Sequence, residues 1–244
     1  MEEYYIFILL ALVAEIIGTI SGFGSSILFV PIASLFFDFK SVLGITAVFH
    51  VFSNLSKIAL FRKGIQKDIV LKLGIPAVIS VTLGALLTTL LPTKQIELVM
   101  NFLLIGLAFY LLTHFEKTLK QTDSNLYFGG ILSGFLAGVA GTGGAIRGLT
   151  LAAFQLPKDI FIATSAMIDL GVDFSRALVY LYNGYFLQEY IYLVPFLIGT
   201  SILGSYIGKQ ILKKTSEKTF HYIVLGIVLI TALFQLYKYF FINQ

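Results

Sequence analysis

The chain has 244 residues, of which 57% are hydrophobic and only 12% are charged, and its mean hydropathy is +0.90. This composition excludes a soluble globular domain and predicts a polytopic membrane protein, because several stretches approach the roughly 20 apolar residues that span a bilayer. The absence of cysteine excludes disulfides and thiolate metal sites. The net charge of +4 comes mainly from short loops between apolar segments, so it indicates membrane topology rather than nucleic-acid binding.

The first half of the chain contains a broken pair of apolar segments followed by three full-length spans. A glycine-rich break at residues 21–25 separates the members of the pair, and a basic loop at 62–68 follows the first full span. The predicted segments are Tyr4–Ile20, Ser26–Phe37, Ser41–Phe61, Ile69–Leu91 and Ile96–Thr113.

The second half repeats this plan after a polar loop at residues 114–125. Its break is the glycine run Gly138–Gly144, which again separates a long apolar segment from a short one. The predicted segments are Leu126–Ala140, Ala145–Leu156, Ile160–Leu181, Tyr190–Leu212 and Thr219–Phe241.

The two halves align with each other at an offset of 119 or 120 residues, which predicts an internal repeat. Gly18 aligns with Gly138 and Gly64 with Gly184 at the larger offset, and at the smaller one His50, Asn54 and Lys57 align with Asp169, Asp173 and Arg176. Repeats of this kind are typical of secondary transporters.

The distribution of basic residues predicts that the two repeats are inverted. Clusters at 62–72 and 209–218 mark cytoplasmic loops. Both loops lie on one side only if the broken pair at 126–156 crosses an even number of times, as a hairpin that is re-entrant or crosses twice. We therefore expect an all-α membrane protein with both termini outside. Its inverted repeats are residues 1–113 and 126–244, each a broken or re-entrant hairpin plus three transmembrane helices, and a cytoplasmic loop at 114–125 connects them.

Asp169, Asp173 and Arg176 share one face of a predicted membrane helix, because they are spaced i, i+4 and i+7. Charged groups at this depth face the protein interior, since exposing one to lipid costs about 2.5–3.5 kcal/mol or more. One interpretation is a structural ion pair between Asp173 and Arg176. The other is a site along a transport pathway, where Asp169 is the better candidate for a titrating carboxylate because it lies farther from Arg176.

The matching face of the first half carries His50, Asn54 and Lys57. Lys57 lies one turn from the basic loop, so it either joins the charge network or extends to the membrane surface. His50 suits a proton relay, but a buried histidine with only a structural hydrogen bond has the same sequence pattern. Glu15 lies three residues before Gly18, and the sequence does not fix its depth.

The two glycine breaks are predicted to form an anion site. The first backbone N–H groups of the short helix after each break have no intrahelical acceptor and carry the positive end of the helix dipole. Ser25, Ser26 and Thr142 add hydroxyl donors. The alternative is close helix packing through small residues.

Arg147 adds a cation three residues after the second glycine run. An arginine is unfavourable at the start of a helix, so it predicts an anionic partner nearby. The partner is either a substrate or one of the carboxylates Asp169 and Asp173.

Over nearly its whole length the chain resembles the TauE/SafE family of sulfite-exporter-like membrane permeases. The resemblance is carried by Gly138-x-x-Gly141-x-Gly143-Gly144, Ala163-Thr164-Ser165-Ala166, Gly18-x-x-Ser21-Gly22-x-Gly24, Pro31 and Thr46-Ala47. Ser25 and Ser26 stand where the family usually has further glycines. The resemblance implies that the substrate is lined by Gly141, Thr142, Gly143, Gly144, Thr164 and Ser165, and in the first half by Gly22, Gly24, Ser25 and Ser26.

The resemblance implies a transporter of the cell (inner) membrane that moves sulfite, an organosulfonate or a similar small oxyanion. We expect alternating access and coupling to protons; a passive anion channel and a cation-coupled transporter of another solute are the alternatives. The sequence contains no motif of an enzyme, a cofactor site or a metal centre. The expected partners are a small anion, the lipid bilayer and a proton or other coupling ion, with no nucleic acid; an oligomer is compatible with the sequence.

Overall fold

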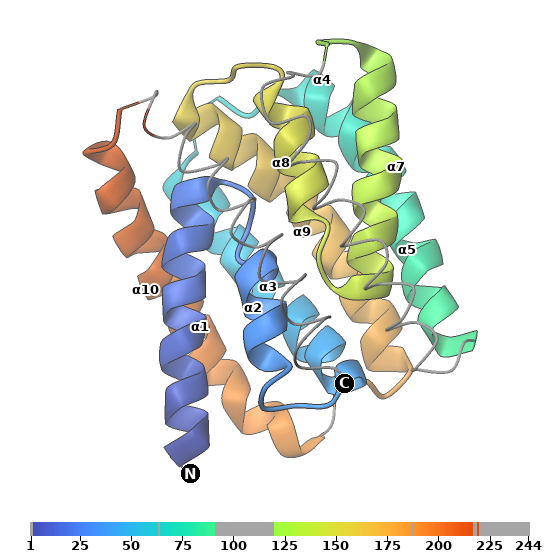
Figure 1. Cartoon of the computed structure of the whole chain (residues 1–244), viewed down its shortest axis with the longest axis vertical. Helices are drawn as coiled ribbons and strands as arrows, with labels where there is room; N and C mark the ends of the chain where they lie inside the picture. The colour runs from blue at the N-terminus through green and yellow to red at the C-terminus, as the bar shows by residue number, and fades with distance from the viewer. Residues whose placement is uncertain (1, 63, 91–119, 187, 217–218, 220–244) are drawn as a thin grey trace, which may run out of the picture.

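The computed structural model describes residues 2–62, 64–90, 120–186, 188–216 and 219, and every regular element among them is helical (Figure 1). The elements are α1 (Glu2–Ser21), α2 (Ser26–Ala33), α3 (Phe39–Leu60), α4 (Lys67–Ile69), η1 (Val70–Gly74), α5 (Ile75–Leu90), α7 (Asp123–Ala140), α8 (Gly144–Ala152), α9 (Lys158–Tyr182), η2 (Gln188–Leu193) and α10 (Val194–Lys213). The predicted all-α fold is thus confirmed. The spans expected at Ile96–Thr113 and Thr219–Phe241, and the turn between residues 91 and 95, lie outside the described residues apart from Thr219 itself.

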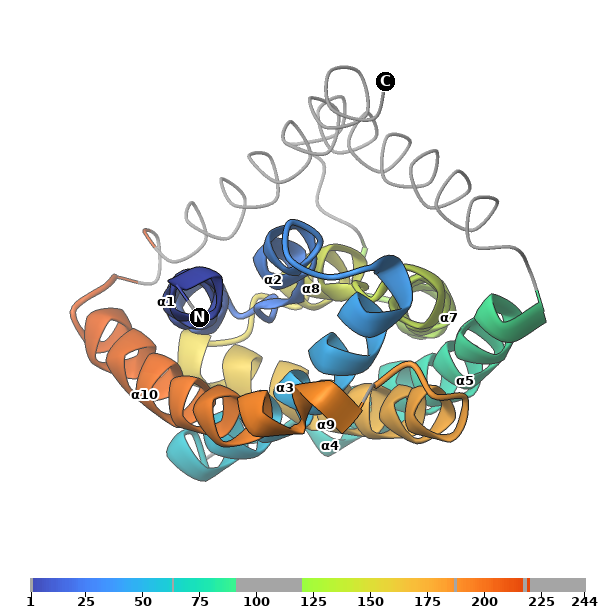
Figure 2. The ribbon, with the colours of Figure 1, turned by 90° about the horizontal axis from the view of Figure 1, so that it is seen from below.

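The longer helices form two packed layers (Figure 2). One layer contains α10, α3, α9 and α5 in that order, and the other contains α1, α2, α8 and α7. Across the layers α1 packs on α10 and α7 packs on α5, while the short helices α2 and α8 pack on α3 and α9. The first helix of each half of the chain therefore packs on a helix of the other half.

Each short helix folds back along the long helix that precedes it. In Figure 1, α1 rises from the N-terminus and α2 returns downward, whereas α7 descends from the opposite end and α8 returns upward. The reversals begin at Gly22 and Gly141, whose φ angles of +73° and +76° lie in the left-handed region that disfavours other residues. The two glycine breaks therefore end their helices through backbone conformation.

Other glycines allow close helix packing. A Cβ atom on Gly130, Gly134 or Gly138 of α7 would lie 2.2–2.3 Å from a backbone carbonyl oxygen of η1 or α5. On α10, a Cβ on Gly204 or Gly208 would meet the side chains of α1. The packing interpretation of the glycine run is thus correct for Gly138, while Gly141 serves the break itself.

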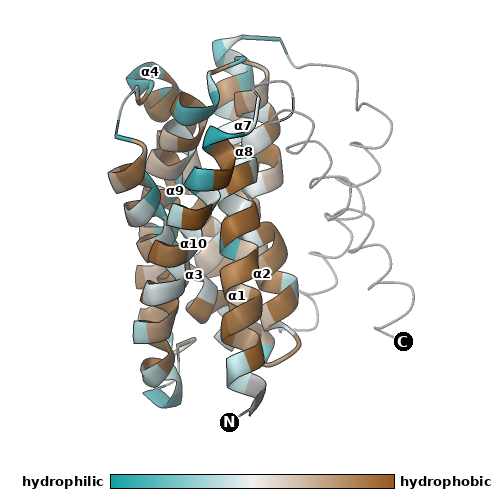
Figure 3. Ribbon diagram, turned by 90° about the vertical axis from the view of Figure 1, so that its left-hand side faces the viewer, coloured by the Kyte–Doolittle hydropathy of each residue, from teal (hydrophilic) through white to brown (hydrophobic). Residues whose placement is uncertain are grey.

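The outer surface suits a bilayer. Hydrophilic residues gather at the two ends of the bundle and hydrophobic residues lie between them (Figure 3). Four described helical segments are long and apolar enough to cross a membrane: Tyr4–Ser21, Phe39–Leu60, Lys67–Leu90 and Gln188–Lys213. With 25 residues and about 1.5 Å of rise per residue, α9 is also long enough, but it carries the buried charged residues Asp169, Asp173 and Arg176.

Both short helices end four residues earlier than predicted, at Ala33 and Ala152 rather than at Phe37 and Leu156. After each end the chain makes i→i+3 backbone hydrogen bonds, for example from the N–H of Phe36 to the carbonyl of Ala33. Such bonds tighten the last turn and close the helix. At about 12–14 Å, these helices are too short to span a bilayer alone.

Candidate functional site

The interior contains a network of charged side chains at the level of the two breaks. Among the described residues, the buried charged side chains are three acids and three bases: Glu15, Lys57, Arg147, Asp169, Asp173 and Arg176. Each base forms a salt bridge with one acid. This pairing fits the cost of burying a charge without a partner, which greatly exceeds that of burying a pair.

Arg147 of α8 pairs with Asp169 of α9, which decides between the two carboxylates considered from the sequence. Its Nη1 contacts Asp169 Oδ1, and its Nε donates to the Ser165 hydroxyl at 3.2 Å. Its Nη2 donates to the carbonyl of Phe23, in the first break, at 2.9 Å. Arg147 thus links the second short helix, the charged face of α9 and the first break.

Asp173 and Arg176 form the second pair, as the structural interpretation expected. Arg176 donates to Asp173 Oδ1 from Nε at 2.8 Å and from Nη2 at 2.7 Å, and Asn54 donates to Asp173 Oδ2 at 2.7 Å. Arg176 Nη1 also donates to the carbonyl of Ala137, near the end of α7, at 3.1 Å. With all these partners inside the protein, this pair holds α3, α7 and α9 together.

Glu15 is fully buried and forms the third pair with Lys57, whose Nζ lies 2.9 Å from Glu15 Oε1. Lys57 therefore does not extend to the membrane surface. The carboxylate also accepts hydrogen bonds from the hydroxyls of Thr19, Ser25, Ser53 and Ser205, which come from α1, the first break, α3 and α10. Ser53 and Ser205 were not predicted as site residues, because isolated serines in membrane helices have no distinguishing pattern in the sequence.

His50 lies beside this group, at 3% exposure. Its Nδ1 is 2.6 Å from the carbonyl oxygen of Thr46, and its Nε2 is 3.0 Å from the hydroxyl of Ser25. The rings of Phe29 and Phe49 pack edge-on against the imidazole. Both ring nitrogens therefore have polar partners beside these two aromatic rings.

The two breaks approach each other at the centre of the molecule. The hydroxyls of Ser26 and Thr142 lie 3.4 Å apart. Gly24 adjoins the Arg147–Asp169 pair, since a Cβ at Gly24 would lie 3.5 Å from Arg147 Nη2 and 3.6 Å from Asp169 Oδ2.

Not every predicted lining residue lies at this centre. The hydroxyl of Thr164 accepts a hydrogen bond from the backbone N–H of Gln66, so it holds the loop before α4. Gly143 makes a close backbone contact with the carbonyl of Ser133, whereas Gly144 packs against the carbonyl of Phe23 in the first break, beside Arg147 Nη2.

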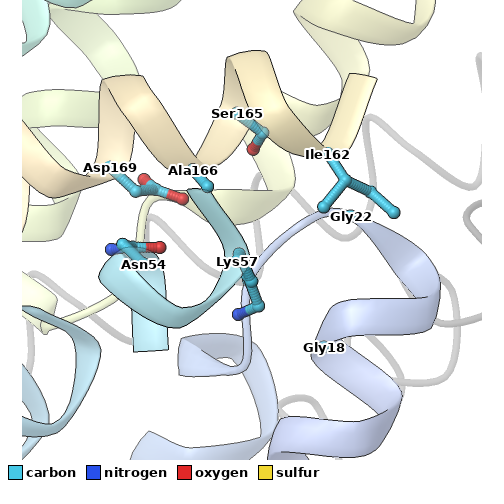
Figure 4. Close-up of a pocket in the computed structure, with 9 residues that line it drawn as sticks. Gly18, Gly22, Asn54, Lys57, Ile162, Ser165, Ala166 and Asp169 are labelled. Carbon is cyan, nitrogen blue, oxygen red and sulfur yellow. The ribbon is translucent and has the colours of Figure 1, made fainter. Parts of the chain in front are cut away.

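A small cavity lies between the first break, α3 and α9 (Figure 4). It is lined by Gly18, Gly22, Gly24, Asn54, Lys57, Ile162, Ser165, Ala166 and Asp169. Its volume of about 10 Å³ suffices for about one water molecule. The cavity thus brings together one member of each of the pairs Lys57–Glu15 and Asp169–Arg147.

The bundle combines apolar spanning helices with two helix breaks that meet in its interior, beside a buried charge network and a cavity. These features are typical of polytopic membrane transporters. The family model described as sulfite exporter TauE/SafE matches residues 7–234, so the chain belongs to this family. It is a membrane protein of a transporter family and not an enzyme. No curated protein and no solved structure matches the sequence or fold of this chain significantly.

Proposed function

We propose that this protein is a proton-coupled secondary transporter of a small sulfur oxyanion, such as sulfite or an organosulfonate, and that the anion binds between Arg147 and Lys57. The observation that carries the proposal is the buried Arg147–Asp169 pair beside the cavity and both breaks. Arginine presents a planar set of donors that matches the oxygens of an oxyanion. The Ser165 hydroxyl, which accepts a hydrogen bond from Arg147 Nε, supplies a further polar group at the same place.

The charge balance of the site links the anion to protons. Arg147 and Lys57 are each neutralised by a carboxylate, Asp169 and Glu15. An anion that replaces Asp169 at the guanidinium leaves this carboxylate buried without a cation, which is unfavourable unless it takes up a proton. Anion and proton therefore bind cooperatively, and by linkage each raises the affinity for the other.

This coupling is compatible with export. A dianion carried with one proton moves one net negative charge. An inside-negative membrane potential of 100 mV favours the outward movement of this charge by about 2.3 kcal/mol.

Alternating access requires the site to open, because a cavity for one water is smaller than an oxyanion. We propose that residues 1–113 and 126–244 are inverted repeats, each with a re-entrant hairpin, joined by the loop at 114–125. The paired left-handed glycines Gly22 and Gly141 support this, as do Gly64 and Gly184, at offsets of 119 and 120. The opposite directions of the α1–α2 and α7–α8 hairpins support it as well.

A thermal-shift screen tests the proposal. Purified protein is heated with sulfite, sulfate, thiosulfate and small sulfonates at two pH values. We expect at least one anion to stabilise the protein, by about 2.7 kcal/mol at 100 times its Kd, and more strongly at the lower pH. Absence of a response to every anion would contradict the proposed site. A passive channel would instead show flux that is independent of pH and of Asp169.

A further inference from the structure

Glu15, Ser25 and His50 form a continuous hydrogen-bonded chain beside the proposed anion site. The Ser25 hydroxyl is 2.5 Å from Glu15 Oε2 and 3.0 Å from His50 Nε2. At the other side of the ring, Nδ1 is 2.6 Å from the carbonyl oxygen of Thr46. A carbonyl oxygen only accepts, so Nδ1 carries a hydrogen and Nε2 is left to interact with Ser25.

The hydrogens of this chain do not balance if Glu15 is ionised and His50 is neutral. The hydroxyl of Ser25 has one hydrogen, while Glu15 Oε2 and His50 Nε2 would both be acceptors. One additional proton satisfies every contact. It resides either on Nε2, with Ser25 donating to Glu15, or on Glu15, with Ser25 donating to Nε2.

We propose that Glu15 and His50 share a single proton through the hydroxyl of Ser25, and that Lys57 determines which of them holds it. To move the proton, the Nε2–H bond of His50 breaks as the Ser25 oxygen gains that hydrogen. Ser25 passes its own hydrogen to Glu15 Oε2. The serine is unchanged, His50 becomes neutral and Glu15 becomes a carboxylic acid.

The surroundings of each end explain the role of Lys57. Glu15 faces the hydroxyls of Thr19, Ser53 and Ser205, and Lys57 is the cation that contacts it. Burial disfavours a charge on His50, and the charged groups that act on it are Asp173 and Arg176 of α9, which already pair with each other, and Glu15, which favours the charged ring. While Lys57 contacts Glu15, the carboxylate is stabilised and the proton belongs on His50.

Lys57 also lines the cavity, so it connects this chain to the anion. An anion that attracts the ammonium group away from Glu15 moves the shared proton from His50 to Glu15. Ser25 is the cap residue at the start of α2 and so lies at the tip of the first hairpin. Movement of this tip breaks the bridge and isolates the proton. The response to the anion rests on the proposed function, whereas the shared proton rests on the hydrogen-bond geometry alone.

Nitrogen-15 NMR of histidine-labelled protein tests the shared proton without any anion. His50 is assigned with the variant His50→Gln, and the carboxylic acid of Glu15 is followed as the infrared C=O band that Glu15→Gln lacks. At neutral pH we expect a wild-type His50 with hydrogens on both nitrogens and no band from Glu15. A neutral His50 beside an ionised Glu15, or an Nδ1 without hydrogen, would overturn the shared proton.

Variants test the bridge and the switch separately. Lys57→Met should convert His50 to the neutral Nδ1–H form and produce the Glu15 band, whereas Lys57→Arg keeps the wild-type spectra. Ser25→Ala should remove the proton from Nε2, and Ser25→Thr, which keeps the hydroxyl, should retain it. Unchanged spectra in Lys57→Met would overturn the role of Lys57, and unchanged spectra in Ser25→Ala would overturn the bridge.

Added sulfite should shift the wild-type spectra in the same direction as Lys57→Met. If sulfite causes no shift while the anion-free results hold, the proposed anion site is wrong and the shared proton stands.

Discussion

Replacing Arg147 by alanine, alone and together with Asp169→Asn, separates a structural ion pair from a transport site. Arg147→Ala leaves Asp169 buried at 7% exposure without its cation, which costs about 3–5 kcal/mol of stability. The double variant removes the uncompensated charge as well. It retains only the loss of the hydrogen bonds to Phe23 and Ser165, about 1–3 kcal/mol together. We therefore expect the second substitution to restore roughly half of the lost stability.

Transport should not recover with stability, because the guanidinium that binds the anion is still missing. The assay combines thermal unfolding of the purified variants with anion flux in proteoliposomes, and Asp169→Asn alone is the matched control. A double variant that regains both stability and flux would show that the pair only holds helices together. A double variant no more stable than Arg147→Ala would refute the electrostatic explanation of the loss.

Three further outcomes follow from the same contacts. The Asp169→Asn variant should bind the anion with little dependence on pH in the thermal-shift screen, since the carboxylate that competes for the guanidinium of Arg147 is gone. A pH dependence equal to that of the wild type would assign the coupling proton to another group. Gly134→Ala should lower the thermal stability by about 1–3 kcal/mol, because its Cβ would lie 2.2 Å from a carbonyl oxygen of α5. Gly199→Ala is its control, because an added Cβ there would meet no atom of another described helix within 4 Å, and it should be neutral or slightly stabilising. Ser205→Ala should cost about 1.5–3 kcal/mol in thermal unfolding, as it removes a hydrogen bond to the buried Glu15 carboxylate; an unchanged stability would contradict the importance of that contact.

The sequence predicted the helices well where local signals are strong. Long apolar runs and glycine clusters placed the described spans within a few residues, because membrane helices and their breaks depend on local composition. The ends of α2 and α8 were wrong by four residues. Their apolar composition continues past the end, and the stop arises from the tight turns that follow.

The site was predictable only in part. The pairing of Asp173 with Arg176 follows from their spacing on one helix, but the choice of Asp169 for Arg147 depends on how α8 packs against α9. The surroundings of Glu15 lay beyond sequence reasoning, because its partners Ser53 and Ser205 are 38 and 190 residues away. Only the fold brings these three residues together.

Anion flux in proteoliposomes tests the central claim most directly. Vesicles loaded with sulfite and containing the wild-type protein are diluted into sulfite-free buffer, and efflux is followed with and without an imposed pH difference. We expect sulfite efflux that responds to the pH difference and is lost in the Arg147→Ala/Asp169→Asn variant. Equal flux through the wild-type protein and this variant would contradict the account, as would the absence of flux for sulfite, thiosulfate and small sulfonates alike.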